Sequence, residues 1–138
     1  MIPSTSGNTA RVERPWLKIA GTVFSARDAR RLAHFYSELL GWPMRGDEPG
    51  WVVVRPDDVT HGLSFHEDVQ FVEPVWPSRP DSQQMMVHLD IGTADLDAAV
   101  EWALECGATL AEYQPQDEVR VMLDPAGHPF CLFPTEHF

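Results

Sequence analysis

The chain has 138 residues and a mass of 15.6 kDa, which is the size of one domain. Its 10 basic and 21 acidic residues give a net charge of −11, which disfavours nucleic acid as a partner and favours a cationic ligand. No apolar run is long enough to cross a bilayer, so we expect no membrane partner.

Cysteine content and the N-terminus indicate the compartment. Cys106 and Cys131 are too few for a disulfide framework, and they match no zinc-finger spacing. The N-terminus lacks the basic and apolar stretches of a signal sequence. We therefore expect a cytoplasmic protein.

The first half of the chain predicts one strand, one helix and three further strands. Residues 1–15 are polar and aperiodic, which is typical of a flexible arm. Ser25 and Asp28 have the spacing of a capping box, and Gly41 follows an amphipathic pattern as a helix cap. The predicted elements are a buried strand at 16–24, the helix between Asp28 and Gly41, and strands at 43–46, 51–55 and 62–67.

The second half repeats this order after a proline-rich stretch at 68–84, which we interpret as a linker. Asp95 to Cys106 has a helical pattern that Gly107 ends. The predicted strands are at 85–92, 109–113, 118–123 and 129–133. The chain therefore reads as two tandem βαβββ modules in one α+β domain at 16–134, with module one at 16–67, module two at 85–134 and a tail at 135–138. Two cupped, mixed sheets with the helices outside would form a barrel around a cavity.

Four segments resemble the vicinal oxygen chelate (VOC) superfamily, which includes glyoxalase I, extradiol dioxygenases and resistance proteins of the bleomycin and fosfomycin types. The segments are DARRLAHFYSELLGW (28–42), QQMMVHLDIGTADLDAAV (83–100), ECGATL (105–110) and VRVMLDPAGHPFCLF (119–133). The sequences of these segments are most similar to those of glyoxalase-like domain proteins of actinobacteria. The resemblance implies the two-module barrel, a ligand in its cavity and a homodimer.

The resemblance also implies where a metal would bind, because superfamily members hold one on the first and last strand of each module. The four matching positions here are Gly21, Ser64, His88 and Cys131. A catalytic divalent ion generally needs three protein donors. We therefore expect no cofactor and no full metal site. If a divalent metal does bind, the expected donors are His88, Cys131 and His66.

Strand alternation assigns further residues to the cavity. His88 is the expected acid or base, and Asp90 is expected to orient it. Cys131 reads as a small buried side chain, with a nucleophile as the alternative if His88 lowers its pKa. The expected ligand-binding residues are Ser64, His66, Trp51, Met86, Cys131, Arg120 and Met122, although the faces of Trp51, Arg120 and Met122 stay open.

Three functions fit these observations. The first is a glyoxalase-like binding protein that holds a small organic molecule without the full metal site. The second is a VOC-type lyase, isomerase or dioxygenase-like enzyme that uses His88 as acid and base or as a metal ligand. The third is an accessory module that acts through its surface. The amino-acid sequence leaves open whether the two modules pair within one chain or across a dimer.

Overall fold

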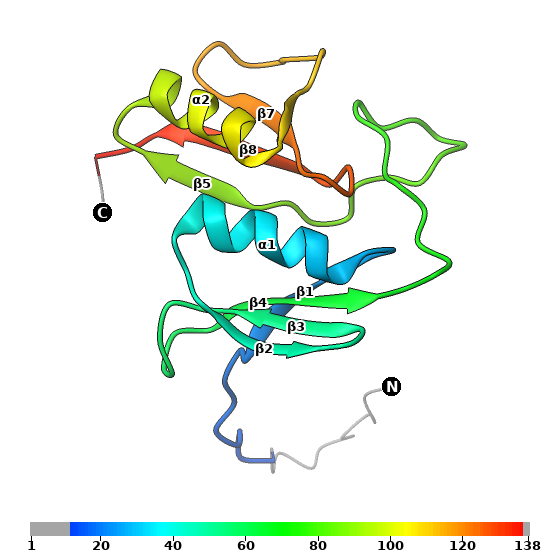
Figure 1. The fold of residues 1–138 in the computed structure, drawn as a ribbon, viewed down its shortest axis with the longest axis vertical. Coiled ribbons are helices and arrows are strands. Elements are labelled where there is room, and N and C mark those ends of the chain that lie inside the picture. Colours follow the sequence, from blue (N-terminus) through cyan, green and yellow to red (C-terminus); the bar gives the residue numbers. More distant parts are fainter. Residues whose placement is uncertain (1–11, 137–138) are drawn as a thin grey trace, which may run out of the picture.

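The computed structural model describes residues 12–136, which form two βαβββ modules side by side (Figure 1). Most of the predicted arm, and residues 137 and 138 of the predicted tail, lie outside the described residues. No helix in the described part of the chain is long and apolar enough to cross a membrane.

Module one has the strand order β1-β4-β3-β2, with β1 and β4 parallel and the other pairs antiparallel. Its elements are β1 (Gly21–Ala26), α1 (Ala29–Leu40), β2 (Met44–Glu48), β3 (Trp51–Val54) and β4 (Gly62–Glu67). The four strands and the helix occur in the order that the sequence predicts.

Module two repeats this topology with the order β5-β8-β7-β6, in which β5 and β8 are parallel. Its elements are β5 (Asp90–Thr93), α2 (Leu96–Cys106), β6 (Thr109–Leu110), β7 (Arg120–Leu123) and β8 (Pro129–Pro134). Residues 68–84 between the modules contain one isolated bridge, from Val75 to Gln84, and no helix or longer strand.

Both helices begin at an aspartate and end at a glycine. The Asp28 carboxylate accepts a hydrogen bond of 3.0 Å from the Arg31 amide, and Asp95 accepts one of 3.1 Å from the Ala98 amide. Gly41 ends α1 with a φ of 71°, a left-handed conformation that favours glycine. The capping box predicted at Ser25 is wrong, because Ser25 still belongs to β1 and pairs with His66 of β4.

Several strands are shorter than the sequence predicts, among them β6, expected at 109–113 and observed at Thr109–Leu110, and β7, expected at 118–123 and observed at Arg120–Leu123. The strand expected at 16–24 starts at Gly21, because its pairing with β4 begins at Gly62 and the preceding loop offers no partner to residues 16–20. The strand expected at 85–92 starts at Asp90, where pairing with Cys131 of β8 begins. A strand exists only where a neighbour accepts its hydrogen bonds, and the apolar pattern alone does not show where the neighbour ends.

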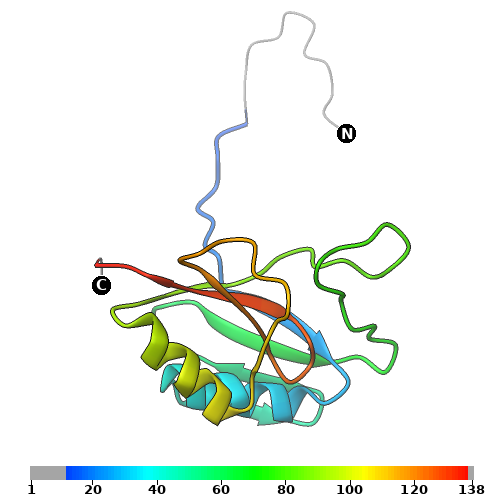
Figure 2. The ribbon, with the colours of Figure 1, turned by 90° about the horizontal axis from the view of Figure 1, so that it is seen from above.

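One hydrophobic core joins the two modules. Phe35 and Tyr36 on α1 contact the Phe130 ring of β8, and the two helices also contact each other. Figure 2 shows α1 and α2 on the same side of the cupped sheets, with residues 12–20 rising on the opposite side. The described strands form two separate four-stranded sheets and not a closed barrel. We call the sheet surface that faces away from the helices the open face.

Candidate functional site

The open face of module one is defined by the strand register. Ser64 lies opposite Val23 of β1 and Val53 of β3, and His66 lies opposite Trp51. Paired residues share a face, whereas the residues between them (Val52, Val54, Leu63 and Phe65) are buried in the core. Ser64, His66 and Trp51 therefore lie on the open face, and the Trp51 and His66 rings have centroids 6.5 Å apart.

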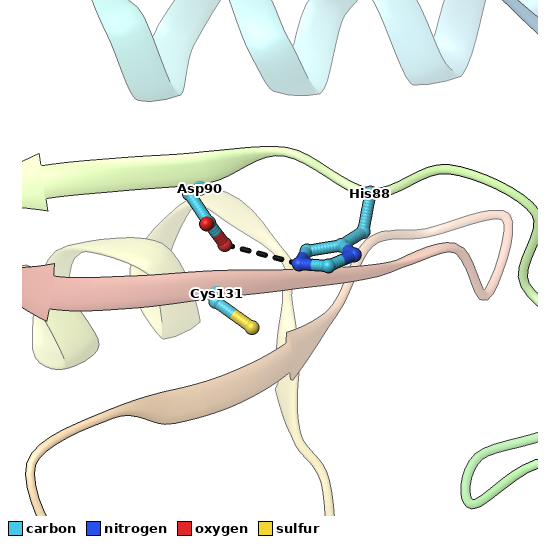
Figure 3. Close-up of side chains that lie close together, drawn as sticks. All are labelled: His88, Asp90 and Cys131. Carbon is cyan, nitrogen blue, oxygen red and sulfur yellow. Dashed lines mark ion pairs between the residues drawn. The ribbon is translucent and has the colours of Figure 1, made fainter.

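The open face of module two brings together His88, Asp90 and Cys131 (Figure 3). Asp90 pairs directly with Cys131 between β5 and β8, and the Cys131 amide donates to the Leu89 carbonyl at 2.9 Å. His88 lies two residues before Asp90, so its side chain points to the same face. The sequence placed these three residues together, and the geometry does the same.

The Asp90 carboxylate lies within ion-pair distance of the His88 imidazole. His88 Nε2 lies 3.1 Å from Asp90 Oδ1, and both side chains are partly open to solvent. When neutral, the imidazole carries its proton on the nitrogen that faces the carboxylate, which leaves Nδ1 as a hydrogen-bond acceptor. In Figure 3 the second ring nitrogen points away from Asp90. A ligand hydroxyl or ammonium group can therefore donate to His88, and an acidic proton can transfer to it.

Cys131 stays a thiol in this setting. Burial raises its pKa, and the negative charge of Asp90 and a hydrogen bond to that carboxylate raise it further. A nucleophilic cysteine needs the opposite shift, because the thiolate is the reactive form. The sequence predicts a nucleophilic Cys131 only if its pKa is lowered. Because the pKa of Cys131 is raised, that condition is not met.

The donor set fits a divalent transition metal. One ligand atom each from His88, Asp90 and Cys131 lies within 4.8 Å of the other two. Imidazole, thiolate and carboxylate are the groups that bind zinc, and three protein donors are the usual number at an open site. His66, the third donor expected from the sequence, lies on the other sheet beside Trp51, and Asp90 takes its place in this cluster.

The four positions implied by the resemblance form two adjacent pairs, one on each sheet. A side chain added at Gly21 would lie 3.7 Å from Ser64 Oγ, just as His88 lies beside Cys131. Gly21 has no donor and Ser64 offers a neutral hydroxyl, so module one contributes weakly to metal binding. Of the four positions implied by the resemblance, the two with metal donors, His88 and Cys131, are in module two.

Arg120 and Met122 lie on the opposite face of their sheet. They pair with Leu132 and Phe130 of the core, and Met122 is fully buried there. The Arg120 guanidinium donates to the carbonyls of the preceding loop, including Asp117 at 2.9 Å. Val121, between these two residues, pairs with Cys131 and belongs to the open face. Arg120 and Met122 share one face, as strand alternation predicts, but nothing in the sequence indicates which face of the sheet that is.

One functional neighbour of the site was missed. The Gln114 side chain accepts from the Val121 amide at 2.8 Å and donates to the Val121 carbonyl at 2.9 Å, as a neighbouring strand would. It fixes β7 next to Cys131 from a loop without regular structure. A lone glutamine in an aperiodic segment gives no signal of this role.

A groove lies beside the cluster, and His88, Asp90 and Cys131 are not among its lining residues. It has a volume of about 440 Å³ and runs between β1 and residues 83–87, with Met86 as the predicted ligand-binding residue that lines it. Met86 is 83% exposed. Of the residues that the sequence predicts around the cavity, Ser64 is buried, Cys131 is partly exposed and His66 is exposed, and none of the three lines this groove.

Comparison with known proteins gives the same architecture. A glyoxalase/bleomycin resistance protein/dioxygenase family enzyme from Burkholderia phytofirmans PsJN is similar, with 18% identity over 83% of this chain and 96% of that chain and a TM-score of 0.64. A fosfomycin resistance protein from Mesorhizobium loti has 13% identity over 87% and 93% and a TM-score of 0.61. An antibiotic binding protein from Streptomyces sp. CB03234 has 21% identity over 88% and 100% and a TM-score of 0.53.

These likenesses are at the level of the fold. No curated protein matches the sequence. The family model described as glyoxalase-like domain matches residues 21–133, from the first residue of β1 to within β8. The chain therefore belongs to the glyoxalase-like domain family, within the VOC superfamily.

Proposed function

We propose that this protein binds a small organic molecule, with a preference for cations, at His88, Asp90 and Cys131 on the open face of module two. The observation that carries the proposal is the convergence of an oriented imidazole, a carboxylate and a thiol on one partly exposed patch. A few polar groups that converge within a mostly apolar wall are typical of small-molecule sites.

Charge supports the preference for cations. The Asp90 carboxylate lies beside the His88 ring, and no lysine or arginine in the described part of the chain forms a salt bridge with it. Residues 90–138 contain ten acidic residues and one basic residue, Arg120, whose guanidinium is held by backbone carbonyls on the other face. A cationic ligand would therefore meet an uncompensated carboxylate beside a ring that can accept a hydrogen bond.

Structural neighbours favour the binding role. One of them is an antibiotic binding protein, and another is a fosfomycin resistance protein. Their identities of 21% and 13% support a shared fold, so the ligand class here rests on the site itself. A homodimer and a cytoplasmic location, where the two free thiols would persist, belong to the same proposal.

A paired ligand screen tests the proposal. Aromatic amines and their uncharged isosteres, such as naphthylmethylamine and naphthylmethanol, would be compared by the shift of the melting temperature. We expect some amines to stabilise the wild type more than their isosteres, and Asp90→Asn to remove the difference. His34→Ala, on the exposed face of α1, serves as the control and should keep it. Equal stabilisation by both members of every pair would contradict the proposal.

The alternative function is a VOC-type lyase, isomerase or dioxygenase-like enzyme, which the metal-compatible geometry of the same three residues favours. A bound divalent ion would polarise a substrate oxygen, and without one His88 would act as acid and base. Metal analysis of protein purified without chelators distinguishes the two functions. Near-stoichiometric metal that is lost in Cys131→Ala would favour the enzyme, whereas metal-free protein that binds amines favours the binding protein.

A further inference from the structure

A pocket of about 240 Å³ lies beside the start of α1, where the two modules and the linker at 68–84 meet. Its walls come from three parts of the chain: the junction of β1 and α1, residues 71–73 of the linker, and the turn between β7 and β8. His88, Asp90 and Cys131 are not among its lining residues, so it is separate from the site proposed above. A ligand in this pocket would contact both modules at once.

The floor of the pocket is apolar and held in place. Leu32 of α1 is 1% exposed and belongs to the core. Phe71 is half-buried, and its ring centroid lies 5.2 Å from that of His128. The His128 ring is itself held by the Ser25 carbonyl oxygen, at 2.8 Å from Nε2. A floor fixed in this way offers a preformed surface to an apolar group of a ligand.

Two arginine side chains that line the pocket have no partner within residues 12–136. Neither the Arg27 nor the Arg31 guanidinium forms a hydrogen bond or a salt bridge there. Four other arginines are engaged, two by aspartates and two by backbone carbonyls: Arg30, Arg45, Arg55 and Arg120. In a chain with a net charge of −11, two unpaired guanidiniums at one pocket favour an anionic group, and their fork geometry suits a carboxylate.

Glu73 brings the opposite charge from the linker. Its carboxylate forms no ion pair with a described residue either. The Glu73 side chain lies against Gly127, where an added Cβ would overlap Glu73 Cγ and Cδ, so the glycine leaves room for it beside the pocket. Asp28 also lines the pocket, but its carboxylate caps α1 by accepting from the Arg31 amide. The free groups are therefore the two guanidiniums and the Glu73 carboxylate.

Opposite charges that line one small pocket without pairing across it favour a ligand that carries both. With two guanidiniums and two carboxylates the lining has no net charge, so a ligand that is neutral overall leaves the balance unchanged. We propose that this pocket binds a small zwitterion with an apolar body, which is the chemistry of a free apolar amino acid. The ligand carboxylate accepts from Arg27 and Arg31, its ammonium group donates to Glu73, and its apolar group covers the floor.

Three probes of one shape separate the two charges. They are L-phenylalanine, L-phenylalaninamide, which lacks the carboxylate, and N-acetyl-L-phenylalanine, which lacks the ammonium group. Titration of the isotope-labelled full chain, followed by two-dimensional NMR, gives an affinity and a location for each. We expect phenylalanine to shift the amide signals of Ala126 and Gly127 and to bind there at least about tenfold more tightly than either derivative. An amine bound at His88 shifts signals near Cys131 instead, so the two sites can fail separately.

Variants of the pocket assign the charges. Arg31→Gln should weaken phenylalanine binding at least about tenfold and leave the binding of phenylalaninamide unchanged. Glu73→Gln should weaken phenylalanine binding until it equals that of N-acetylphenylalanine. Arg79→Gln, at an exposed arginine of the linker that does not line the pocket, is the control and should keep the wild-type affinity.

Circular dichroism should show the wild-type fold in all three variants, since the substituted side chains are exposed. Three results would overturn the inference. The first is the absence of phenylalanine-dependent shifts at Ala126 and Gly127, and the second is equal affinity of this pocket for all three probes. The third is undiminished phenylalanine binding by Arg31→Gln or by Glu73→Gln.

Discussion

The Tyr36 hydroxyl donates a hydrogen bond of 2.7 Å to Asp124 Oδ2, which joins the helix of module one to the turn before β8 of module two. Both residues are buried, with Tyr36 fully enclosed and Asp124 4% exposed. The other carboxylate oxygen accepts from the amides of Ala126 and His128. This network satisfies a buried carboxylate at the contact between the two modules.

Tyr36→Phe is expected to lower the free energy of unfolding by about 1–3 kcal/mol, because it leaves a buried acceptor without its partner. Urea denaturation followed by circular dichroism measures the change. Tyr113→Phe is the matched control, since Tyr113 is 49% exposed, and it should change stability by less than about 0.5 kcal/mol. Equal stability of the two variants would show that the hydroxyl contributes nothing at the module contact.

Alkaline pH should destabilise the wild type through the same residue. Burial, and then the charge of Asp124, raises the pKa of Tyr36 well above its ordinary value of 10.0. The folded state therefore holds the phenol proton more firmly than the unfolded chain does. The resulting stability is complete below pH 10.0 and decreases as the pH rises toward the folded-state pKa. Tyr36→Phe should show a shallower decrease above this pH, and parallel curves would contradict the assignment.

Asp90→Asn should make Cys131 more reactive. The Asp90 carboxylate contributes to the raised pKa of the thiol, so its neutralisation lowers that pKa and increases the thiolate fraction at mildly alkaline pH. We expect several-fold faster alkylation by iodoacetamide, measured by mass spectrometry of the peptide that contains Cys131. Cys106 is the internal control, because burial raises its pKa to about 12 beside Glu38 and Glu105. An unchanged ratio of the two rates would count against the contact between Asp90 and Cys131.

Gly62→Ala should lower the stability of the fold, whereas Gly46→Ala should leave it nearly unchanged. A methyl group at Gly62 would overlap the Val54 carbonyl and the Arg55 side chain, whereas one at Gly46 would meet Val53 atoms at ordinary distances of 3.7 Å or more. Overpacking of this kind costs about 1–3 kcal/mol. Thermal denaturation of the two variants compares them directly, and a similar melting temperature would show that β4 can shift away from β3.

The helices, the order of the strands and the duplication could be predicted from the sequence because they depend on local patterns. Gly41 and Gly107 mark helix ends, and the apolar spacing of α1 gives its buried face. The start of β1 could not be predicted, because the apolar residues before Gly21 have the same sequence pattern whether they are buried in a strand or exposed to solvent. Strand ends depend on partners that are distant in the sequence.

The candidate site was predicted to a similar extent. Alternation from His88 to Asp90 along the strand expected at 85–92 was enough to group them, although the observed strand β5 begins at Asp90, and the repeat aligned Cys131 with them. Which residues of β7 face the core could not be predicted, because Arg120, Val121 and Met122 do not alternate between polar and apolar side chains. Their faces are set by pairing with β8.

Isothermal titration calorimetry with the amine that stabilises the protein most, and with its uncharged isostere, tests the binding site most directly. The wild type and His34→Ala should bind the amine with equal affinity and the isostere more weakly. His88→Ala should weaken the binding of the amine by at least about tenfold, because a ligand donor loses its acceptor beside a carboxylate. Undiminished binding by His88→Ala would show that the ligand lies elsewhere and that this patch is not the site.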